Sequence, residues 1–387
     1  MCCKKVALPV TFFTKSPVPL VNLSLITFCF LHKSCNSTID ILQFYIFPKY
    51  YSIFNNSVGN ILLNSTYYRN GYLSASKHFC EKDLEVDVTG RSFMITGANS
   101  GIGKSAAIEI AKRGGVVHMV CRDLKRGEDA LNEIKEITGN QNIKLHQLDM
   151  SKPNDVLKFT KEFETSGEKL NVLINNAGCM VNTREVTEEG YEKNFATNTL
   201  GTHILTTGLT SVLSKYDDPR VIIVTSGGML TQKLNIDDLQ VEKLSSFDGT
   251  MVYAQNKRQQ VVMTEIYATK YPSIHFSCMH PGWADTPAVR SAMPSFYEKM
   301  KDRLRSAEQG ADTAVWLAVI PNIKQKPNGE FYQDRQVVSK HLPLAWTKSS
   351  SQENEELVKK LDEIFTSSIK STMLSLYHYS WKPNSVL

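Results

Sequence analysis

The fold is decided by the stretch Thr96-Gly97-Ala98-Asn99-Ser100-Gly101-Ile102-Gly103. The apolar residues 93–95 just before it predict a short buried strand. The residues just after it place apolar side chains on one helical face until Gly114 and Gly115 end the pattern. A strand, a glycine turn and a helix in that order form an anion site, because the glycines let the backbone approach a pyrophosphate and the helix N-terminus points at it. The stretch therefore predicts a site for the phosphates of a dinucleotide.

Strand patterns and helix patterns alternate on both sides of this turn. Strand-like runs occur at 93–95, 116–120, 143–148, 170–174, 221–225 and 274–279. Helical patterns lie between them at 103–113, 125–138, 153–164, 188–214 and 250–270. Such alternation is typical of a parallel sheet with helices on both faces. We therefore predict an α/β fold with a doubly wound parallel sheet of the Rossmann type, forming a single domain with an irregular N-terminal extension.

The domain is expected to span residues 67–348, with regions of different character on either side. Residues 1–66 contain an uncharged stretch from 16 to 31 and then an Asn-, Ser- and aromatic-rich segment without a period. A targeting segment, a membrane anchor and an extension without a fold all fit this composition, and the last is favoured. A helical stripe at 57–80 indicates a lead-in helix on the domain, or an amphipathic element that touches a membrane. In the tail, 349–387, we expect an exposed turn or linker at 349–356 and then a short helix.

Charge and cysteine content exclude several classes of function. The chain of 387 residues carries 44 basic and 39 acidic residues, and the resulting charge of +5 is spread without a block, which argues against a nucleic-acid partner. The eight cysteines include no C-x-x-C pair and no histidine spacing typical of zinc, so no metal site is predicted. Scattered single cysteines favour a reducing compartment, and we expect a cytoplasmic protein. Membrane association through the N-terminal segment is the alternative.

The residues after the second strand bear on the choice of cofactor. An acidic residue there binds the ribose hydroxyls of NAD, whereas a basic residue pairs with the 2′-phosphate of NADP. The chain places Arg122 first, and its planar guanidinium suits a phosphate. Asp123 competes as a partner for the ribose, but it also fits as the cap of the next helix. We predict NADP, with NAD as the alternative, and we expect Asp149 after the third strand to meet the adenine.

A tyrosine and a lysine four residues apart begin the helical pattern 250–270. Tyr253 and Lys257 share one helix face, so the ammonium can lie near the phenol. A phenol with its ordinary pKa of about 10 ionises little at neutral pH, and a fixed positive charge nearby favours the phenolate. The pair is thus suited to proton transfer. The motif is weak alone, since both residue types are common on helix surfaces, but it is strong when a dinucleotide turn lies upstream.

Four motifs together resemble the short-chain dehydrogenase/reductase superfamily. They are the glycine turn 96–103, Asn175-Asn176-Ala177-Gly178, Tyr253-x-x-x-Lys257, and Pro281-Gly282 followed by Thr286. The resemblance covers roughly residues 67–346. One departure is that Thr225-Ser226 stands where a Ser-Ser pair is more common. Three residues separate Gly97 from Gly101, whereas the superfamily branch that acts on sugar nucleotides has two, which argues against an epimerase or dehydratase.

The resemblance implies roles for individual residues. Ser226 would hydrogen-bond the substrate oxygen, and Tyr253 would exchange a proton with it. Asn198 would hold a water that relays protons to Lys257. Lys257 would also hold the nicotinamide ribose, and Thr286 the carboxamide. The further cofactor contacts that it implies are Gly97, Asn99, Ser100, Gly101, Ile102, Gly103, Asn176, Ala177, Gly178, Pro281 and Gly282.

The expected reaction is hydride transfer between NADP(H) and a carbonyl or alcohol substrate. The segment 283–305 is expected to form a lid over the substrate, with Ala288, Val289, Met293, Pro294, Phe296, Tyr297 and Met300 facing inward. Such a lining suits an apolar substrate such as a lipid, retinoid or steroid. A catalytically silent nucleotide-binding regulatory protein on the same fold is the rival, and a missing Tyr253 or Lys257 would have favoured it.

Overall fold

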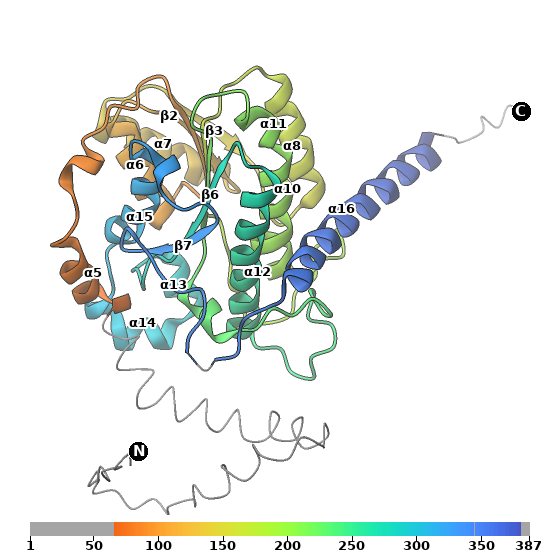
Figure 1. Ribbon diagram of the computed structural model, residues 1–387. Coiled ribbons are helices and arrows are strands. Elements are labelled where there is room, and N and C mark those ends of the chain that lie inside the picture. The colour runs from red at the N-terminus through yellow and green to blue at the C-terminus, as the bar shows by residue number, and fades with distance from the viewer. Residues whose placement is uncertain (1–65, 344, 381–387) are drawn as a thin grey trace, which may run out of the picture. The chain divides into compact units, whose positions relative to one another are not determined.

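The computed structural model of the chain describes residues 66–343 and 345–380 (Figure 1). Its centre is a sheet with the strand order β3-β2-β1-β4-β5-β6-β7-β8, in which all neighbours are parallel except the pair β7 and β8. The strands are β1 (Ser92–Thr96), β2 (Val116–Cys121), β3 (Ile143–Gln147), β4 (Val172–Asn175), β5 (Arg220–Val224), β6 (His275–Met279), β7 (Glu330–Gln333) and β8 (Gln336–Val337). The order runs outward in both directions from β1 and β4. The doubly wound parallel sheet predicted from the sequence is therefore confirmed.

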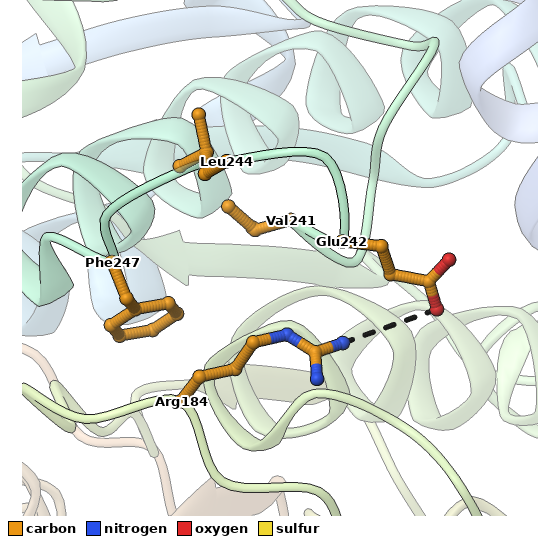
Figure 2. Close-up of a pocket in the computed structure, with 5 residues that line it drawn as sticks. All are labelled: Arg184, Val241, Glu242, Leu244 and Phe247. Carbon is orange, nitrogen blue, oxygen red and sulfur yellow. Dashed lines mark ion pairs between the residues drawn. The ribbon is translucent and has the colours of Figure 1, made fainter.

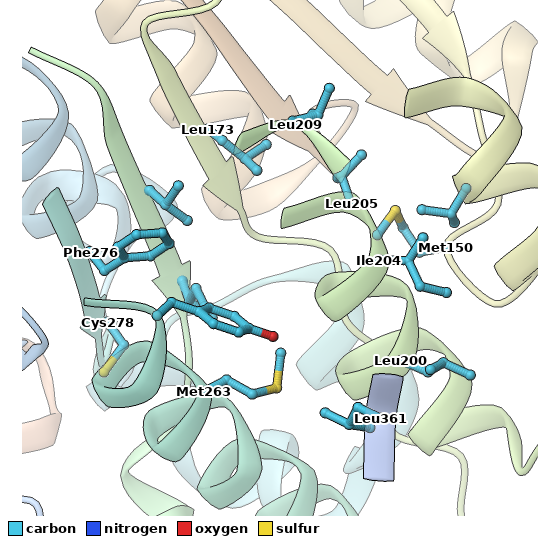
Figure 3. Packing of buried hydrophobic residues seen from close by; sticks show 14 of the residues in the cluster. Met150, Leu173, Leu200, Ile204, Leu205, Leu209, Met263, Phe276, Cys278 and Leu361 are labelled. Atoms are coloured by element: carbon cyan, nitrogen blue, oxygen red, sulfur yellow. The ribbon is translucent and has the colours of Figure 1, made fainter. Parts of the chain in front are cut away.

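Helices cover both faces of this sheet. One apolar cluster joins the sheet to α6 (Gly101–Lys112), α7 (Leu124–Thr138) and α15 (Ala307–Val319). The other joins it to α8 (Pro153–Thr165), α10 (Gly201–Gly208), α11 (Thr210–Leu213), α12 (Gly249–Lys270) and α16 (Ser351–Ser380). Figure 3 shows this second cluster, where Leu361 of α16 lies among Leu200, Met263 and their neighbours. The burial of both sheet faces explains why most strands read as unbroken apolar runs and not as alternating ones.

Two regions differ from the elements predicted between the strands. The pattern 188–214 was expected to be one helix, but the helix begins only at α9 (Lys193–Phe195) and passes through a π-helical turn, η2 (Ala196–Leu200), before α10. Glu192 caps α9 by accepting hydrogen bonds from the amides of Asn194 and Phe195. Nor were α15, β7 and β8 predicted. α15 is buried at nearly every position from Gly310 to Val319, so its sequence shows no amphipathic stripe.

The C-terminal helix is much longer than the sequence suggested. The expected turn or linker at 349–356 is wrong from residue 351 onward, because α16 begins at Ser351 and continues to Ser380. The Ser350 hydroxyl accepts from the Glu353 amide at 3.1 Å, and the Glu353 carboxylate accepts from the Ser350 amide at 2.7 Å. This reciprocal pair is a capping box, which turns a polar run into a helix start.

A short N-terminal strap, residues 66–76, leads into the domain and ends in α5 (Arg69–Ser76). The predicted helical stripe 57–80 is described only from Thr66, and the expectations for residues 1–65 lie outside the described residues. Arg305 holds the strap by donating to the backbone oxygens of Tyr67 (3.1 Å) and Thr66 (2.6 Å), while Asp334 binds the same guanidinium at 2.6 and 2.9 Å. Within residues 66–343 and 345–380, no helix is both long and apolar enough to cross a membrane.

Candidate active site

The turn between β1 and α6 has a backbone that only glycine permits. Gly97 and Gly101 have φ values of +68° and +52°, in the left-handed region that disfavours side chains. A Cβ atom on Gly103 would lie 2.4 Å from the backbone oxygen of Gly97. The first turn of α6 therefore sits directly against the strand end, and the side chain of its N-cap, Ser100, makes no hydrogen bond to it. This cradle fits the pyrophosphate of a dinucleotide.

The end of β1 is tied to the end of β4, its neighbour in the sheet. The Thr96 hydroxyl accepts hydrogen bonds from the amides of Asn176 and Ala177, both at 2.9 Å. The side chain of Asn176 donates to the backbone oxygen of Thr96 at 2.8 Å. These bonds join the glycine turn to the Asn-Asn-Ala-Gly motif at the point where the strand order reverses, which is where open α/β sheets bind their ligands.

A cleft of about 500 Å³ opens at this edge of the sheet. It brings together all but two of the site residues predicted from the sequence: Gly97, Asn99, Ser100, Gly101, Ile102, Arg122, Asp149, Asn176, Ala177, Gly178, Ser226, Tyr253, Lys257, Pro281, Gly282 and Thr286. The two that do not line it are Gly103, which packs under the turn, and Asn198, which lies buried behind the loop that follows β4.

Two arginines line the end of the cleft next to β2. Arg122 is exposed there, and Arg126, in the first turn of α7, lines the same region. Asp123 caps α7 by accepting from the Arg126 amide at 3.0 Å, as its alternative role required. Asp123 also lines the cleft, but one of its carboxylate oxygens is engaged with the helix. Arg126 escaped the sequence analysis because it lies inside a helical pattern.

Tyr253 and Lys257 stand on the first half of α12, which Asp248 caps by accepting from the amides of Thr250 and Met251. The Lys257 ammonium lies 5.3 Å from the centre of the Tyr253 ring and donates to the backbone oxygen of Val224 at 2.9 Å. Burial lowers the pKa of Lys257 to about 7 and raises the pKa of Tyr253 above its usual value. Hydrogen bonds from Lys257 to acceptors therefore matter, because they favour the charged ammonium against burial.

Asn198 lies in the π-helical turn η2 and works through both its side chain and its backbone. Its side-chain oxygen accepts from the Cys179 amide at 2.9 Å, and its side-chain nitrogen donates to the Cys179 oxygen at 2.8 Å. These two bonds hold the loop that follows β4 against the cleft. The backbone oxygen of Asn198 accepts from the Gln260 side chain at 2.6 Å, and the Gln260 oxygen in turn accepts from Lys257 at 3.0 Å.

Ser226 follows β5 and begins the 3-10 turn η3 (Gly227–Thr231). Its hydroxyl accepts from the Gly228 amide at 3.2 Å and lines the cleft. The turn is fixed from the other side by His280, whose Nδ1 accepts from the Gly227 amide at 3.0 Å. Burial, with a smaller effect of Arg305, lowers the pKa of His280 to about 3 and keeps the ring neutral. His280 also lines the cleft and was not predicted.

The substrate end of the cleft is covered by two short helices, α13 (Pro287–Ala292) and α14 (Pro294–Met300). Of the side chains expected to face inward, four line the cleft, namely Ala288, Val289, Met293 and Phe296. The Phe296 ring meets Trp283 edge-on at 4.9 Å between ring centres. Pro294, Tyr297 and Met300 are not among the lining residues, which corrects the expectation for these three. Tyr297 instead packs under Arg290 on the outer side.

A second, smaller hollow of about 240 Å³ lies apart from these residues (Figure 2). Val241, Glu242, Leu244 and Phe247 line it from one loop, and Arg184 faces them from another, with its guanidinium 3.9 Å from the Glu242 carboxylate. It contains none of the predicted site residues. The chemistry suggested by the sequence is therefore confined to the large cleft.

Comparison with known proteins agrees with this geometry. The profile of the short chain dehydrogenase family matches residues 91–235. Over 298 residues the chain is 61% identical to dehydrogenase/reductase SDR family member 12 of Bos taurus, an alignment that covers 77% of this chain and 93% of the relative. The chain belongs to the short-chain dehydrogenase/reductase family. Among more distant members, human retinol dehydrogenase 11 is 30% identical over 283 residues, covering 72% of this chain and 86% of that protein.

A solved structure of the same family shares the fold. A short chain dehydrogenase from Escherichia coli CFT073, complexed with NADPH, superposes with a TM-score of 0.52 at 21% identity, covering 66% of this chain and all of the other. The family therefore accounts for the sheet, the glycine turn and the Tyr-x-x-x-Lys motif. Arg126, His280 and Gln260 remain features of this short-chain dehydrogenase/reductase that the motif comparison did not single out.

Proposed function

We propose that the protein is an NADP(H)-dependent oxidoreductase that interconverts an apolar carbonyl compound and the corresponding alcohol. The observation that carries the proposal is the pair of the partly exposed Tyr253 and the buried Lys257 on one wall of a cleft whose other end is a glycine cradle. NADPH, when bound, supplies the hydride. The chain's own residues then have to hold the substrate oxygen and deliver its proton.

The proton is assigned to Tyr253. In the direction of reduction, the Tyr253 hydroxyl donates its proton to the substrate oxygen, and the Ser226 hydroxyl holds that oxygen by a hydrogen bond. The Lys257 ammonium stabilises the phenolate that remains, which offsets the rise in the Tyr253 pKa caused by burial. Asn198 keeps the loop with Cys179 in place, so that the cleft wall next to the pair is rigid.

The preference for NADP rests on the two arginines at the adenosine end. Arg122 and Arg126 both line the cleft there, while Asp123 is occupied as a helix cap. A guanidinium pairs well with a 2′-phosphate and offers nothing comparable to a free hydroxyl. The NADPH in the related Escherichia coli structure agrees with this preference.

The substrate class rests on the lining of the other end. Trp283, Met293, Phe296 and Val289 present an apolar surface, with Met180 on the opposite loop. A retinoid, steroid or lipid carbonyl would bury much of its surface against such side chains. The name of the relative retinol dehydrogenase 11 is consistent with that class.

The test is turnover of a panel of carbonyls and alcohols with each cofactor, followed through the absorbance of the reduced nicotinamide. We expect NADPH-dependent reduction of apolar carbonyls. Replacing Tyr253→Phe removes the proton donor and should lower kcat by at least about 10²-fold, since positioned acid–base groups contribute about 10²–10⁴-fold. NADPH binding should stay close to that of the unaltered protein. Retained turnover in the variant would remove Tyr253 from its assigned role.

The same proposal concerns where the protein works. We infer a cytoplasmic enzyme, since the four cysteines within the described residues are all unpaired, with membrane attachment through the N-terminal residues as the alternative. Deleting residues 1–65 and measuring pelleting with membranes separates the two. If the full chain and the shortened chain both stay in the supernatant, the protein is cytoplasmic. If the full chain pellets with membranes and the shortened chain does not, the N-terminal residues attach it to a membrane.

A further inference from the structure

The side-chain amide of Gln260 bridges two groups directly behind the Tyr253–Lys257 pair. Its nitrogen donates to the backbone oxygen of Asn198 at 2.6 Å, and its oxygen accepts from the Lys257 ammonium at 3.0 Å. Gln260 is 1% exposed, and Lys257 and Asn198 are equally buried. The amide thus bridges the lysine and that backbone oxygen.

The orientation of this amide follows from its two partners. Asn198 offers a carbonyl oxygen, which only accepts, and Lys257 offers an ammonium, which only donates. Turning the amide over would place its NH₂ group against the ammonium and its oxygen against the carbonyl, leaving both contacts repulsive. Gln260 is therefore held in one orientation.

The Lys257 ammonium has three N–H groups that can donate hydrogen bonds. One goes to the backbone oxygen of Val224 at 2.9 Å and one to Gln260. The third remains for the cleft side, where Tyr253 lies. Two fixed acceptors at the back of the ammonium thus direct its remaining donor toward the reacting groups.

The resemblance to the short-chain dehydrogenase/reductase superfamily implies that Asn198 holds a water that relays protons to Lys257. In this chain the backbone oxygen of Asn198 is instead paired with an amide nitrogen. A chain of water can pass a proton along by exchanging its bonds, whereas an amide keeps its N–H protons at neutral pH. The bridge through Gln260 therefore does not itself pass a proton from Asn198 to Lys257.

We propose that Gln260 is a positioning residue that holds the Lys257 ammonium toward Tyr253 and closes the back route for protons from Asn198 to Lys257, so that Tyr253 regains its proton from the open side of the cleft. The inference rests on the proposed function, because it assigns Tyr253 and Lys257 to proton transfer. Gln260 itself does not touch the substrate, and it acts through Lys257.

The pH dependence of turnover can report this role, because few charged groups surround the lysine. Tyr253 on the same helix and Cys179 on the loop that follows β4 are the titratable groups that face it. The end of β5 contributes the neutral carbonyl of Val224, which binds Lys257 directly. The turn η2 contributes the neutral carbonyl of Asn198, which is linked to Lys257 through Gln260. In reduction the pair must be protonated, so the rate should fall on the alkaline side as the pair loses its proton.

Two substitutions should shift the alkaline limb of the pH–rate profile, the part where the rate falls as the pH rises, in opposite directions. Gln260→Leu removes an acceptor from the ammonium, so the limb should move to lower pH by about one unit, with kcat about tenfold lower above neutral pH. Gln260→Glu keeps the size of the side chain, gives up the bond to the Asn198 oxygen and adds a negative charge next to the pair, so the limb should move to higher pH by a similar amount. The measurement is kcat for carbonyl reduction with saturating NADPH between pH 5 and pH 10.

Gln259→Leu is the matched control. Gln259 is equally buried on the same helix, but its oxygen accepts from the Thr199 hydroxyl at 2.6 Å and the Asn256 side chain at 3.4 Å, and not from Lys257. Its loss should lower the melting temperature and leave the limb where it is. If the Gln260 variants show the same limb as the unaltered enzyme, or if the control shifts the limb as much as they do, Gln260 has only a structural role. Should Gln260→Leu fail to fold, the shift in Gln260→Glu decides the question.

A crystal structure of the unaltered protein with NADPH provides a second readout, independent of turnover. We expect the Gln260 amide between Asn198 and Lys257, and in Gln260→Ala a water in its place. A water bonded to both groups in the unaltered protein would overturn the inference. If the unaltered protein turns over no substrate in the panel, the proposed function fails, and the position of the amide still tests the bridge separately.

Discussion

The two ends of the cleft are built by different means. At the cofactor end, the glycine turn and the first turn of α6 approach so closely that a single added carbon at Gly103 would meet a backbone oxygen. At the substrate end, α13 and α14 contain no buried residue, and the cleft is shaped by the outer parts of a few apolar side chains. The shape of the cofactor end is set by the path of the backbone, and the shape of the substrate end is set by the side chains that line it. Substitutions at the cofactor end should therefore abolish cofactor binding, whereas substitutions at the substrate end should weaken substrate binding gradually.

The largest effect is expected for Gly103→Val. The new Cβ would lie 2.4 Å from the backbone oxygen of Gly97, so the turn must open and lose its phosphate contacts. We expect NADPH affinity to fall by at least about 100-fold in a calorimetric titration. The control is Gly190→Ala, since Gly190 also has a positive φ of +84° but nothing near its Cβ position. That variant should lose about 1 kcal/mol of stability and still bind NADPH. Tight binding by Gly103→Val would show that the turn adapts.

The next effect should appear at the two arginines. Removing both in Arg122→Ala, Arg126→Ala eliminates the charge-assisted contacts expected with the 2′-phosphate, which together are worth about 1.5–3 kcal/mol because both side chains are exposed. The ratio of kcat/KM for NADPH over NADH should fall by about 10–100-fold, while the value for NADH changes little. An unchanged ratio would mean that the cofactor preference is set elsewhere in the cleft.

A graded effect is expected at the substrate end. Phe296→Ala removes a ring that packs edge-on against Trp283 and lines the cleft. Loss of that apolar contact is worth about 1–2 kcal/mol, so KM for a bulky apolar carbonyl should rise about tenfold, and KM for a small carbonyl should not. Tyr297→Ala is the control, because Tyr297 packs against Arg290 outside the cleft. Equal changes for the two substrates would argue against an apolar substrate site under α14.

The smallest effect should arise far from both ends, on α16. The Asp362 carboxylate lies 3.0 Å from the buried ring of His203 and 3.6 Å from Lys270, and these partners, the His203 ring first, lower its pKa. A lowered carboxylate pKa gives stability that is present above the unfolded pKa of about 3.9 and is lost as the pH falls through the folded value.

Asp362→Asn should therefore cost at most about 1 kcal/mol at pH 7, because the side chain is half exposed and screened by solvent. The cost should shrink below about pH 4, as urea unfolding at several pH values can measure. The kcat value should not change. A cost that is independent of pH would show that Asp362 contributes packing and not charge.

The parts of the molecule that the sequence predicts are those whose signal is local. The glycine turn, six of the strands and the Tyr253–Lys257 spacing each need only neighbouring residues to be recognised. α15 was missed because burial on nearly all sides removes the amphipathic pattern, and β7 and β8 because they are short. The polar run 349–356 resembles a linker in the sequence, but residues 351–356 form the start of α16, which the capping box of Ser350 and Glu353 stabilises.

Gln260 could not be found in this way. It belongs to a run of polar residues on a buried helix, where nothing in the sequence separates it from Gln259. Its partner at Asn198 is a backbone oxygen, which every residue possesses, so the side chain at that position gives no hint of the bond. Only the fold brings residues 198 and 260 together.

The Arg305 clamp on the N-terminal strap has a consequence for evolution and for protein engineering. The guanidinium binds the backbone oxygens of residues 66 and 67, and not their side chains. Substitutions at these two positions leave those oxygens in place, so the hydrogen bonds from Arg305 survive a change of side chain, whereas the buried Tyr67 ring and its edge-on contact with His280 do not. Removing the residues themselves cannot be compensated in that way. The strap is for this reason a poor place to cut, and a shortened gene should retain it.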